Sequence, residues 1–361
     1  GGAAMMTRRI PGARVRGMTL VELMVGATIG LFLIIVMGGV YVGSKGTFTA
    51  QESTSRLQEN GRFAMDTIAN DLRMSGFRGC ATLTLDPVSG KFTKPPVNVT
   101  LNTPTSVLYR YGEQTWGSHH SGGGWVPALT APLSTLAMDG NSDLLVIRRP
   151  IGGGWSLTAE MASKNAALTI TANPNFQQGD LLMVADCGGA TVLQATNAAP
   201  GASGSIEHTP GALGLVPGVS TSDLGRQFLN DAAIWRVQTV AYYVGPSVRR
   251  SGEMALWSYT SPVYDGGAQQ TELVTGVERM AVSYGVDTNN DSSADQFHTA
   301  DAVADWSQVA STRVELLLVG EKGSSGSATQ PIVFDGNTLN FTDRRMRTVM
   351  SLAVSLRNAV P

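Results

Sequence analysis

The stretch from Asp287 to Asp295 has the side-chain pattern that is best suited to binding a ligand. Every second residue in it carries an oxygen-bearing side chain. Calcium binds about six to eight oxygen ligands, and a turning loop with this spacing directs several oxygens toward one point. The stretch is therefore a candidate calcium site with the ligands Asp287, Asn289, Asp291, Ser293 and Asp295.

A solvated polar turn is the alternative interpretation of this stretch. Its first half follows the EF-hand loop pattern, but Ser292 stands where that pattern has glycine and His298 where it has a bidentate glutamate. Asp and Asn side chains also bond to the backbone of their own turn, which gives an Asx turn without a metal. No other cofactor is expected.

Motifs of the common enzyme classes do not occur in the chain. It has no G-x-S-x-G, H-E-x-x-H, C-x-x-C or Walker motif. His119 and His120 are adjacent, but they supply two metal ligands without a third. The net charge of −2 gives no basis for a stable nucleic-acid partner. We therefore expect a protein that is not an enzyme.

An apolar run near the N-terminus is the first element that positions the rest of the chain. About 25 mostly apolar residues extend from Met18 to about Val42, with Glu22 as their one carboxylate. At about 1.5 Å per residue, a helix of this length crosses a bilayer core of about 30 Å. The arginines before it favour a cytoplasmic N-terminus and export of the rest of the chain. They are Arg8, Arg9, Arg14 and Arg16.

Two common explanations account for this run only in part. A secretory signal peptide has a shorter apolar core of about 7–15 residues, followed by a cleavage site of small residues. A plain membrane anchor explains the length of the run. It does not explain Glu22, because a carboxylate costs roughly 2.5–3.5 kcal/mol near the bilayer centre and somewhat less near its edge.

The sequence Gly-Met-Thr-Leu-Val-Glu from Gly17 to Glu22, followed by the apolar helix, resembles the class III signal of type IV prepilins and type II secretion pseudopilins. The resemblance implies cleavage between Gly17 and Met18 by a prepilin peptidase and N-methylation of Met18. It also implies that Glu22 acts in subunit assembly. A buried carboxylate requires a cation, which the new N-terminal amine of a neighbouring subunit would supply.

The helix is expected to continue beyond the membrane, to about Ser75. An apolar stripe repeats there every three or four residues, which is typical of one helix face. Its members are Leu57, Gly61, Ala64, Ile68 and Leu72. Such a face must be covered, and a β-sheet made by the rest of the chain is the natural cover.

Runs of β-branched and aromatic residues predict the strands of this sheet. Phe341–Leu356 fits either a strand or a helix, and Glu272–Met280 has a helical alternative. Trp116 and Trp125 flank a glycine-rich loop and are expected to fill a core, with an exposed binding surface as the alternative. The predicted strands are Val107–Tyr111, Leu144–Arg148, Ala167–Thr171, Asp180–Ala185, Thr191–Ala195, Ser205–His208, Trp235–Val244 (followed by a turn at Gly245-Pro246), Glu253–Tyr259, Leu273–Val286 and Thr312–Val319.

Several further segments resemble minor pilins of the PilW family. They are Glu59–Ala64, Asn70–Cys80, Gly179–Cys187, Gly276–Glu278, Tyr284–Asp287 and Asp343–Asn358. The resemblance implies an α+β, type IV pilin-like fold, with a long N-terminal helix packed on an antiparallel sheet and an additional β-rich region. The implied parts are a leader (1–17), a transmembrane and filament-core helix (18–43), the amphipathic half of that helix (44–80) and a periplasmic β-rich domain (81–361).

The family resemblance also implies a function. A minor pilin primes or caps the type IV pilus at its tip, together with other minor pilins, the major pilin, a PilY-type adhesin and the inner-membrane assembly platform. Twitching motility and cell adhesion would follow. The chain would span the inner membrane once, with its C-terminal domain in the periplasm, and would later be extracellular in the pilus.

Two other functions stay open. The nearer one is a J-like minor pseudopilin of a type II secretion system, which shares the N-terminal signal, the helix and the sheet. The other is a membrane-anchored periplasmic binding protein or enzyme, which would keep its N-terminus uncleaved.

Cys80 and Cys187 are the two cysteines of the chain. An exported domain lies in an oxidising compartment, so a disulfide between them is expected, with two free buried thiols as the alternative. The bond would close a loop of roughly 100 residues and contribute up to about 4–5 kcal/mol in the chain-entropy model.

Overall fold

The computed structural model describes residues 17–81, 84–85, 87, 92–93, 95, 97–102, 106–173, 175–212, 214–325 and 329–356. Most of the predicted leader, residues 1–16, lies outside these residues, and so does the C-terminal segment 357–361. The chain divides into two compact units, Gly1–Glu52 and Ser53–Pro361. Helix α1 (Leu20–Met74) has residues in both.

The first unit contains the apolar half of α1. The helix begins at Leu20, two residues after the predicted start at Met18. This half is long and apolar enough to cross a membrane, and none of its most apolar window is buried. Large side chains such as Leu31 and Phe32 are exposed to solvent. By length and composition, this half of the helix could therefore serve as a membrane anchor.

The second half of α1 buries the predicted apolar stripe. Leu57, Gly61, Ala64, Ile68 and Leu72 are all buried, as the spacing predicts. A Cβ atom at Gly61 would clash with the side chain of Met350, so the glycine permits the helix to approach the sheet closely.

The described strands form two larger antiparallel sheets and two hairpins. In the first sheet the order is β10-β7-β6-β11-β8-β9-β3, with β12 and β13 continuing from β11, and β4 and β5 from β6. The pairing of β3 with β9 is parallel. The second sheet has the order β15-β14-β16-β19, and β1–β2 and β17–β18 are the hairpins.

The strand bounds follow. In the first part of the chain they are β1 (Thr84–Leu85), β2 (Phe92–Thr93), β3 (Val97–Val99), β4 (Thr115–Ser121), β5 (Gly124–Val126), β6 (Leu144–Ala159), β7 (Leu168–Ile170), β8 (Leu181–Asp186), β9 (Gly189–Gln194) and β10 (Ser205–Ile206). The remaining strands are β11 (Ala233–Pro246), β12 (Met254–Ser261), β13 (Gln270–Thr275), β14 (Val277–Val286), β15 (Gln296–His298), β16 (Val309–Val319), β17 (Gln330–Phe334), β18 (Asn337–Phe341) and β19 (Arg347–Ser355).

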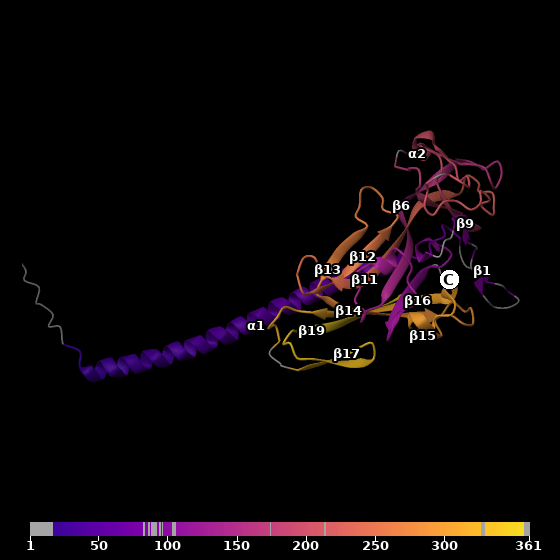
Figure 1. Ribbon diagram of the computed structural model, residues 1–361. Coiled ribbons are helices and arrows are strands. Elements are labelled where there is room, and N and C mark those ends of the chain that lie inside the picture. The colour runs from indigo at the N-terminus through magenta and orange to yellow at the C-terminus, as the bar shows by residue number, and fades with distance from the viewer. Residues whose placement is uncertain are drawn as a thin grey trace, which may run out of the picture. The chain divides into compact units, whose positions relative to one another are not determined.

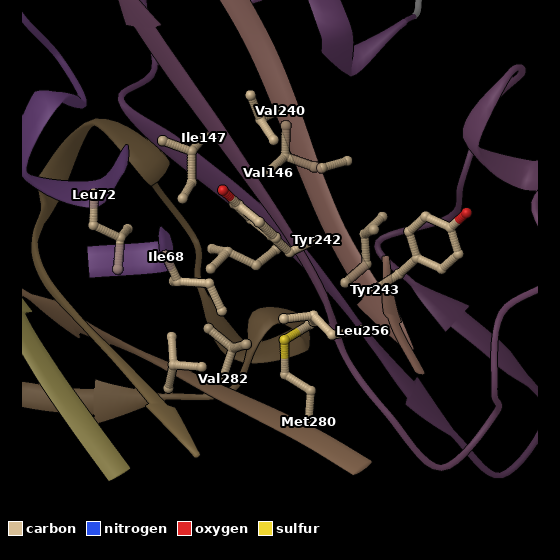
Figure 2. Packing of buried hydrophobic residues seen from close by; sticks show 14 of the residues in the cluster. Ile68, Leu72, Val146, Ile147, Val240, Tyr242, Tyr243, Leu256, Met280 and Val282 are labelled. Carbon is tan, nitrogen blue, oxygen red and sulfur yellow. The ribbon is translucent and has the colours of Figure 1, made fainter. Parts of the chain in front are cut away.

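The second half of α1 shares one hydrophobic core with both sheets. Strands β11 and β12 of the first sheet and β14 and β16 of the second contribute to this core together with the helix (Figure 1). Figure 2 shows Ile68 and Leu72 of α1 near Tyr242 of β11 and Val282 of β14. The hydroxyl of Tyr242 donates a hydrogen bond of 2.7 Å to Asp71 on the helix. The helix is thus a central element of the second unit.

Most strand predictions in the central and C-terminal parts are confirmed. Between Gln270 and Val286 the structure has strands, so the helical alternative there is wrong. They are separate strands because Gly276, with a φ of 86°, turns the chain between them. For Phe341–Leu356 the strand alternative is correct over the residues of β19.

Three predictions need correction. The segment predicted as a strand at Val107–Tyr111 starts with a 3₁₀ helix, Val107–Tyr109, because Ser106 Oγ caps it by accepting from the Leu108 N–H. The predicted turn at Gly245-Pro246 is wrong, since β11 continues through Pro246, which pairs with Met254. The stretch expected to be a glycine-rich loop is instead the hairpin of β4 and β5.

Both tryptophans of this hairpin pack against the main core, as predicted. Trp116 is 4% exposed and lies 5.9 Å from Trp306, measured between ring centroids. Trp125 is half-buried and packs edge-on against His120. The prediction that these two tryptophans contribute to a core is therefore confirmed.

Candidate functional site

The start of α1 has a reciprocal pair of hydrogen-bonding residues. The backbone N–H and the hydroxyl of Thr19 each donate to Glu22 Oε2 at 3.0 Å, and the Glu22 N–H donates to Thr19 Oγ1 at 3.3 Å. This is a capping box, in which Thr19 is the N-cap and Glu22 the third helical residue. It fixes the first turn of the helix immediately after Met18.

The capping box gives Glu22 a second role that the sequence reasoning missed. The pattern S/T-x-x-E before an apolar run was the visible signal. The carboxylate also lies at the positive end of the helix dipole, which favours a negative charge there. Met18 is 71% exposed, so both Met18 and Glu22 are accessible at this end of the helix.

The predicted disulfide is present between Cys80 and Cys187. Their Cα atoms are 4.6 Å apart, and 107 positions separate them in the sequence. Cys80 follows the end of α1, and Cys187 lies in the turn between β8 and β9. The bond therefore ties the segment after the helix to a hairpin of the first sheet.

Glycines make the approach of Cys80 to this hairpin possible. Gly76 and Gly79 have φ angles of 64° and 68°, a left-handed conformation that ends helices and favours glycine. A Cβ at Gly79 would lie 2.9 Å from the Cβ of Ala185. These contacts explain why the segment after the helix contains both glycines.

The loop from Asp287 to Asp295 is held together by its own carboxylates. The buried side chain of Asp287 accepts hydrogen bonds from the N–H groups of Asn290, Asp291 and Ser292 at 2.6, 3.2 and 2.8 Å. Asp295 Oδ2 accepts two bonds from Thr288, and these hold the pKa of Asp295 below its usual value. The bonds have the pattern of Asx turns.

The remaining candidate ligands lie in the same loop. Asn289 Nδ2 donates to Asp291 Oδ2 at 3.1 Å, and the Ser293 N–H donates to Asp291 Oδ1 at 2.8 Å. Ser292, at the position where the EF-hand pattern has glycine, adopts a left-handed φ of 71°. Within the described parts of the chain, no group of three or more His, Cys, Asp or Glu residues is placed to hold a metal ion.

The sequence makes this loop a candidate calcium site, its hydrogen bonds argue against binding, and thermal unfolding with Ca²⁺ decides between the two. A bound ion would compete with the N–H groups that already occupy the Asp287 carboxylate. We therefore expect Ca²⁺ to leave the Tm of the full chain unchanged, with Mg²⁺ as the control ion. A rise in Tm that Ca²⁺ alone produces and that Asp291→Ala abolishes would instead establish a calcium site.

The adjacent histidines lie beside a cavity of about 480 Å³ whose lining also includes Asp143 and Asp335. His119 Nδ1 lies 2.6 Å from Asp143 Oδ1, and Asp143 also accepts a bond of 2.7 Å from the Val282 N–H. Burial raises the pKa of Asp143, while these two hydrogen bonds oppose the rise. The His119–Asp143 contact links β4 to the end of the loop before β6.

Comparison with known proteins gives one family. Residues 241–358, about a third of the chain, match the family model of PilW, type IV pilus-assembly protein W. No curated protein and no solved structure matches the chain. The matched residues include the end of β11, β12 and β13 of the first sheet and the whole second sheet, so the match supports the PilW resemblance there and a role in type IV pilus assembly. The N-terminal signal lies outside the match.

Proposed function

We propose that this chain is a minor pilin that primes or caps the type IV pilus at its tip. The observation that carries the proposal is the match of residues 241–358 to the pilus-assembly family. An N-terminal helix that is long and apolar enough to cross a membrane supports it. The chain is proposed to act by binding other subunits, without catalysis.

Each half of α1 has its own role in this proposal. The apolar half holds the chain in the inner membrane, with the N-terminus in the cytoplasm and the β-rich unit in the periplasm. After cleavage between Gly17 and Met18 and methylation of Met18, the same half packs beside the helices of other minor pilins and the major pilin. The amphipathic half is fixed by its core contacts and by the Cys80–Cys187 bond, so it carries the β-rich unit with it.

The proposed partners follow from the same family. In the inner membrane, the chain interacts with the prepilin peptidase and with the assembly platform. At the tip of the pilus, it contacts a PilY-type adhesin. Motility and adhesion depend on it through the pilus. A J-like minor pseudopilin is the second candidate, because the signal and the helix are shared, whereas the family match favours the pilus.

The intact mass of the purified protein tests the N-terminal part of the proposal. We expect the chain from cells with a prepilin peptidase to lack residues 1–17 and to carry the mass of one added methyl group. The chain from a peptidase-deleted strain should keep its full length. An uncleaved chain in both strains would make the N-terminus a plain anchor and remove the assembly role of Glu22.

Deletion of the gene separates the pilus from the secretion system. In a host that has both systems, we expect loss of sheared surface pili, restored by the intact gene, and unchanged release of type II substrates. Loss of secretion with normal pili would favour the pseudopilin instead.

A further inference from the structure

Arg78, between the end of α1 and Cys80, is a buried cation that no carboxylate of the described residues neutralises. The residue is 6% exposed, and the Nε and Nη1 atoms of its side chain are buried without a hydrogen-bond partner. Burial lowers its pKa, but an arginine still stays protonated at neutral pH. A guanidinium in this state is costly unless an anion lies against it.

The neighbouring charges do not compensate Arg78. Arg149 Nε lies 2.9 Å from Asp71 Oδ1, and that carboxylate also accepts the Tyr242 hydroxyl. Arg148 Nη2 lies 3.8 Å from Glu113 Oε2. Arg110 Nη1 lies 3.8 Å from the other oxygen of Glu113. The two acids beside this site thus lie against three other arginines, and over the part of the chain that the structure describes no carboxylate pairs with Arg78. Among the described residues, the buried charge of Arg78 therefore has no negative partner.

A small cavity lies against these arginines. Its volume is about 20 Å³, and its lining includes Arg78, Arg148, Arg149, Tyr111 and Met183 together with one acid, Glu113. Tyr111 is buried and brings a hydroxyl to the same wall. A cavity of this size holds about one water-sized occupant. Phosphate, sulfate and a peptide carboxylate with its chain are too large for it.

We propose that this cavity binds one small monovalent inorganic anion of the size of chloride, held by Nε and Nη1 of Arg78. The size of the cavity selects a monatomic ion, and the single buried charge of Arg78 selects an anion with one negative charge. The anion would bridge the segment after α1 to the strands that carry Arg148 and Met183, β6 and β8. It would therefore strengthen the same junction that the Cys80–Cys187 bond closes.

Thermal unfolding in different salts tests this site. The full mature chain, in a non-ionic detergent, would be compared in sodium chloride, sodium bromide and sodium gluconate at equal ionic strength. With chloride or bromide at about ten times the Kd of that ion for the site, we expect the Tm to be roughly 2–4 °C higher than in gluconate. Gluconate gives no such rise because its anion is too large for the cavity.

Two variants separate a bound ion from general salt effects. Arg78→Met should remove the difference between the salts, and in gluconate it should be at least as stable as the native chain because the buried charge is gone. Arg62→Met is the matched control, since it makes the same change at a side chain that is 84% exposed, on helix α1. It should keep the full chloride effect.

A direct view of the ion keeps the proposal testable if Arg78→Met does not fold. Crystals grown in sodium bromide should give an anomalous peak beside the Arg78 guanidinium. Equal Tm values of the native chain in all three salts would overturn the proposal. So would a chloride effect that survives in Arg78→Met, or a bromide-grown crystal without the peak.

Discussion

Replacing Glu22 by alanine should strongly reduce surface piliation while the chain still inserts into the membrane. Insertion depends on the apolar run, which the change makes more apolar. Assembly, as proposed, places the Glu22 carboxylate against the N-terminal amine of a neighbouring subunit, away from water. Losing one partner of a buried ion pair costs about 3–5 kcal/mol, which weakens the contact at least roughly 100-fold. Sheared pili and the membrane fraction would be measured together by immunoblot.

The capping box makes the alanine variant ambiguous by itself. Glu22→Ala removes both the charge and the hydrogen bonds to Thr19 that start the helix. Glu22→Gln removes the charge but keeps the capping box, because glutamine serves at that position as glutamate does. Thr19→Ala does the reverse, since it keeps the carboxylate and removes the cap side chain, at a cost of about 1 kcal/mol.

The two single-function variants should therefore differ. We expect Glu22→Gln to lose pili as Glu22→Ala does, and Thr19→Ala to assemble nearly normally. Intact mass would confirm that each variant is still cleaved after Gly17. Normal piliation in Glu22→Gln together with failure in Thr19→Ala would mean that Glu22 acts through the start of the helix, and the ion pair between subunits would have to be abandoned.

The long helix could be predicted well because its signals are local. The apolar stripe from Leu57 to Leu72 repeats at the helical period, and the structure buries each predicted member. The same spacing does not tell why one member is glycine. That reason is Met350, nearly 300 positions later in the chain, and no local pattern places it beside Gly61.

The β-rich region was predictable only where strands have apolar runs. β8 and β16 are such runs and were found, whereas β4 contains two histidines and two serines and is followed by three glycines, Gly122 to Gly124. Its strand form depends on pairing with β6, where Trp116 lies opposite Val146. Tertiary pairing thus overrides a local preference for a loop.

The candidate sites divide in the same way. The disulfide could be predicted because the chain has two cysteines and an exported domain lies in an oxidising compartment, and the structure confirms the bond. Arg78 could not be singled out from the sequence. Its lack of a partner depends on the pairing of Asp71 with Arg149 and of Glu113 with Arg148, which only the folded chain brings together.

Removing the disulfide should lower the free energy of unfolding by roughly 4–5 kcal/mol. The bond joins residues 107 positions apart, so its loss allows the unfolded chain many more conformations. A domain whose total stability is about 5–15 kcal/mol would lose much of its margin. The measurement is denaturant unfolding of the full chain in detergent, comparing native protein with Cys80→Ala/Cys187→Ala. The double variant is preferred because each single variant would leave the other cysteine as a free thiol.

The position of the bond determines how the loss of stability would affect the proposed role in pilus assembly. It joins the segment after α1 to the turn between β8 and β9, and neither cysteine belongs to the main core that contains the helix stripe. We therefore expect the double variant to keep its native fold at low temperature and to be degraded faster in the periplasm, so that pili decrease at higher growth temperature. Native protein treated with reductant should match the double variant in its denaturant midpoint. A midpoint that neither treatment moves would show that the unfolded chain is already compact around this junction, since the bond would then restrict little.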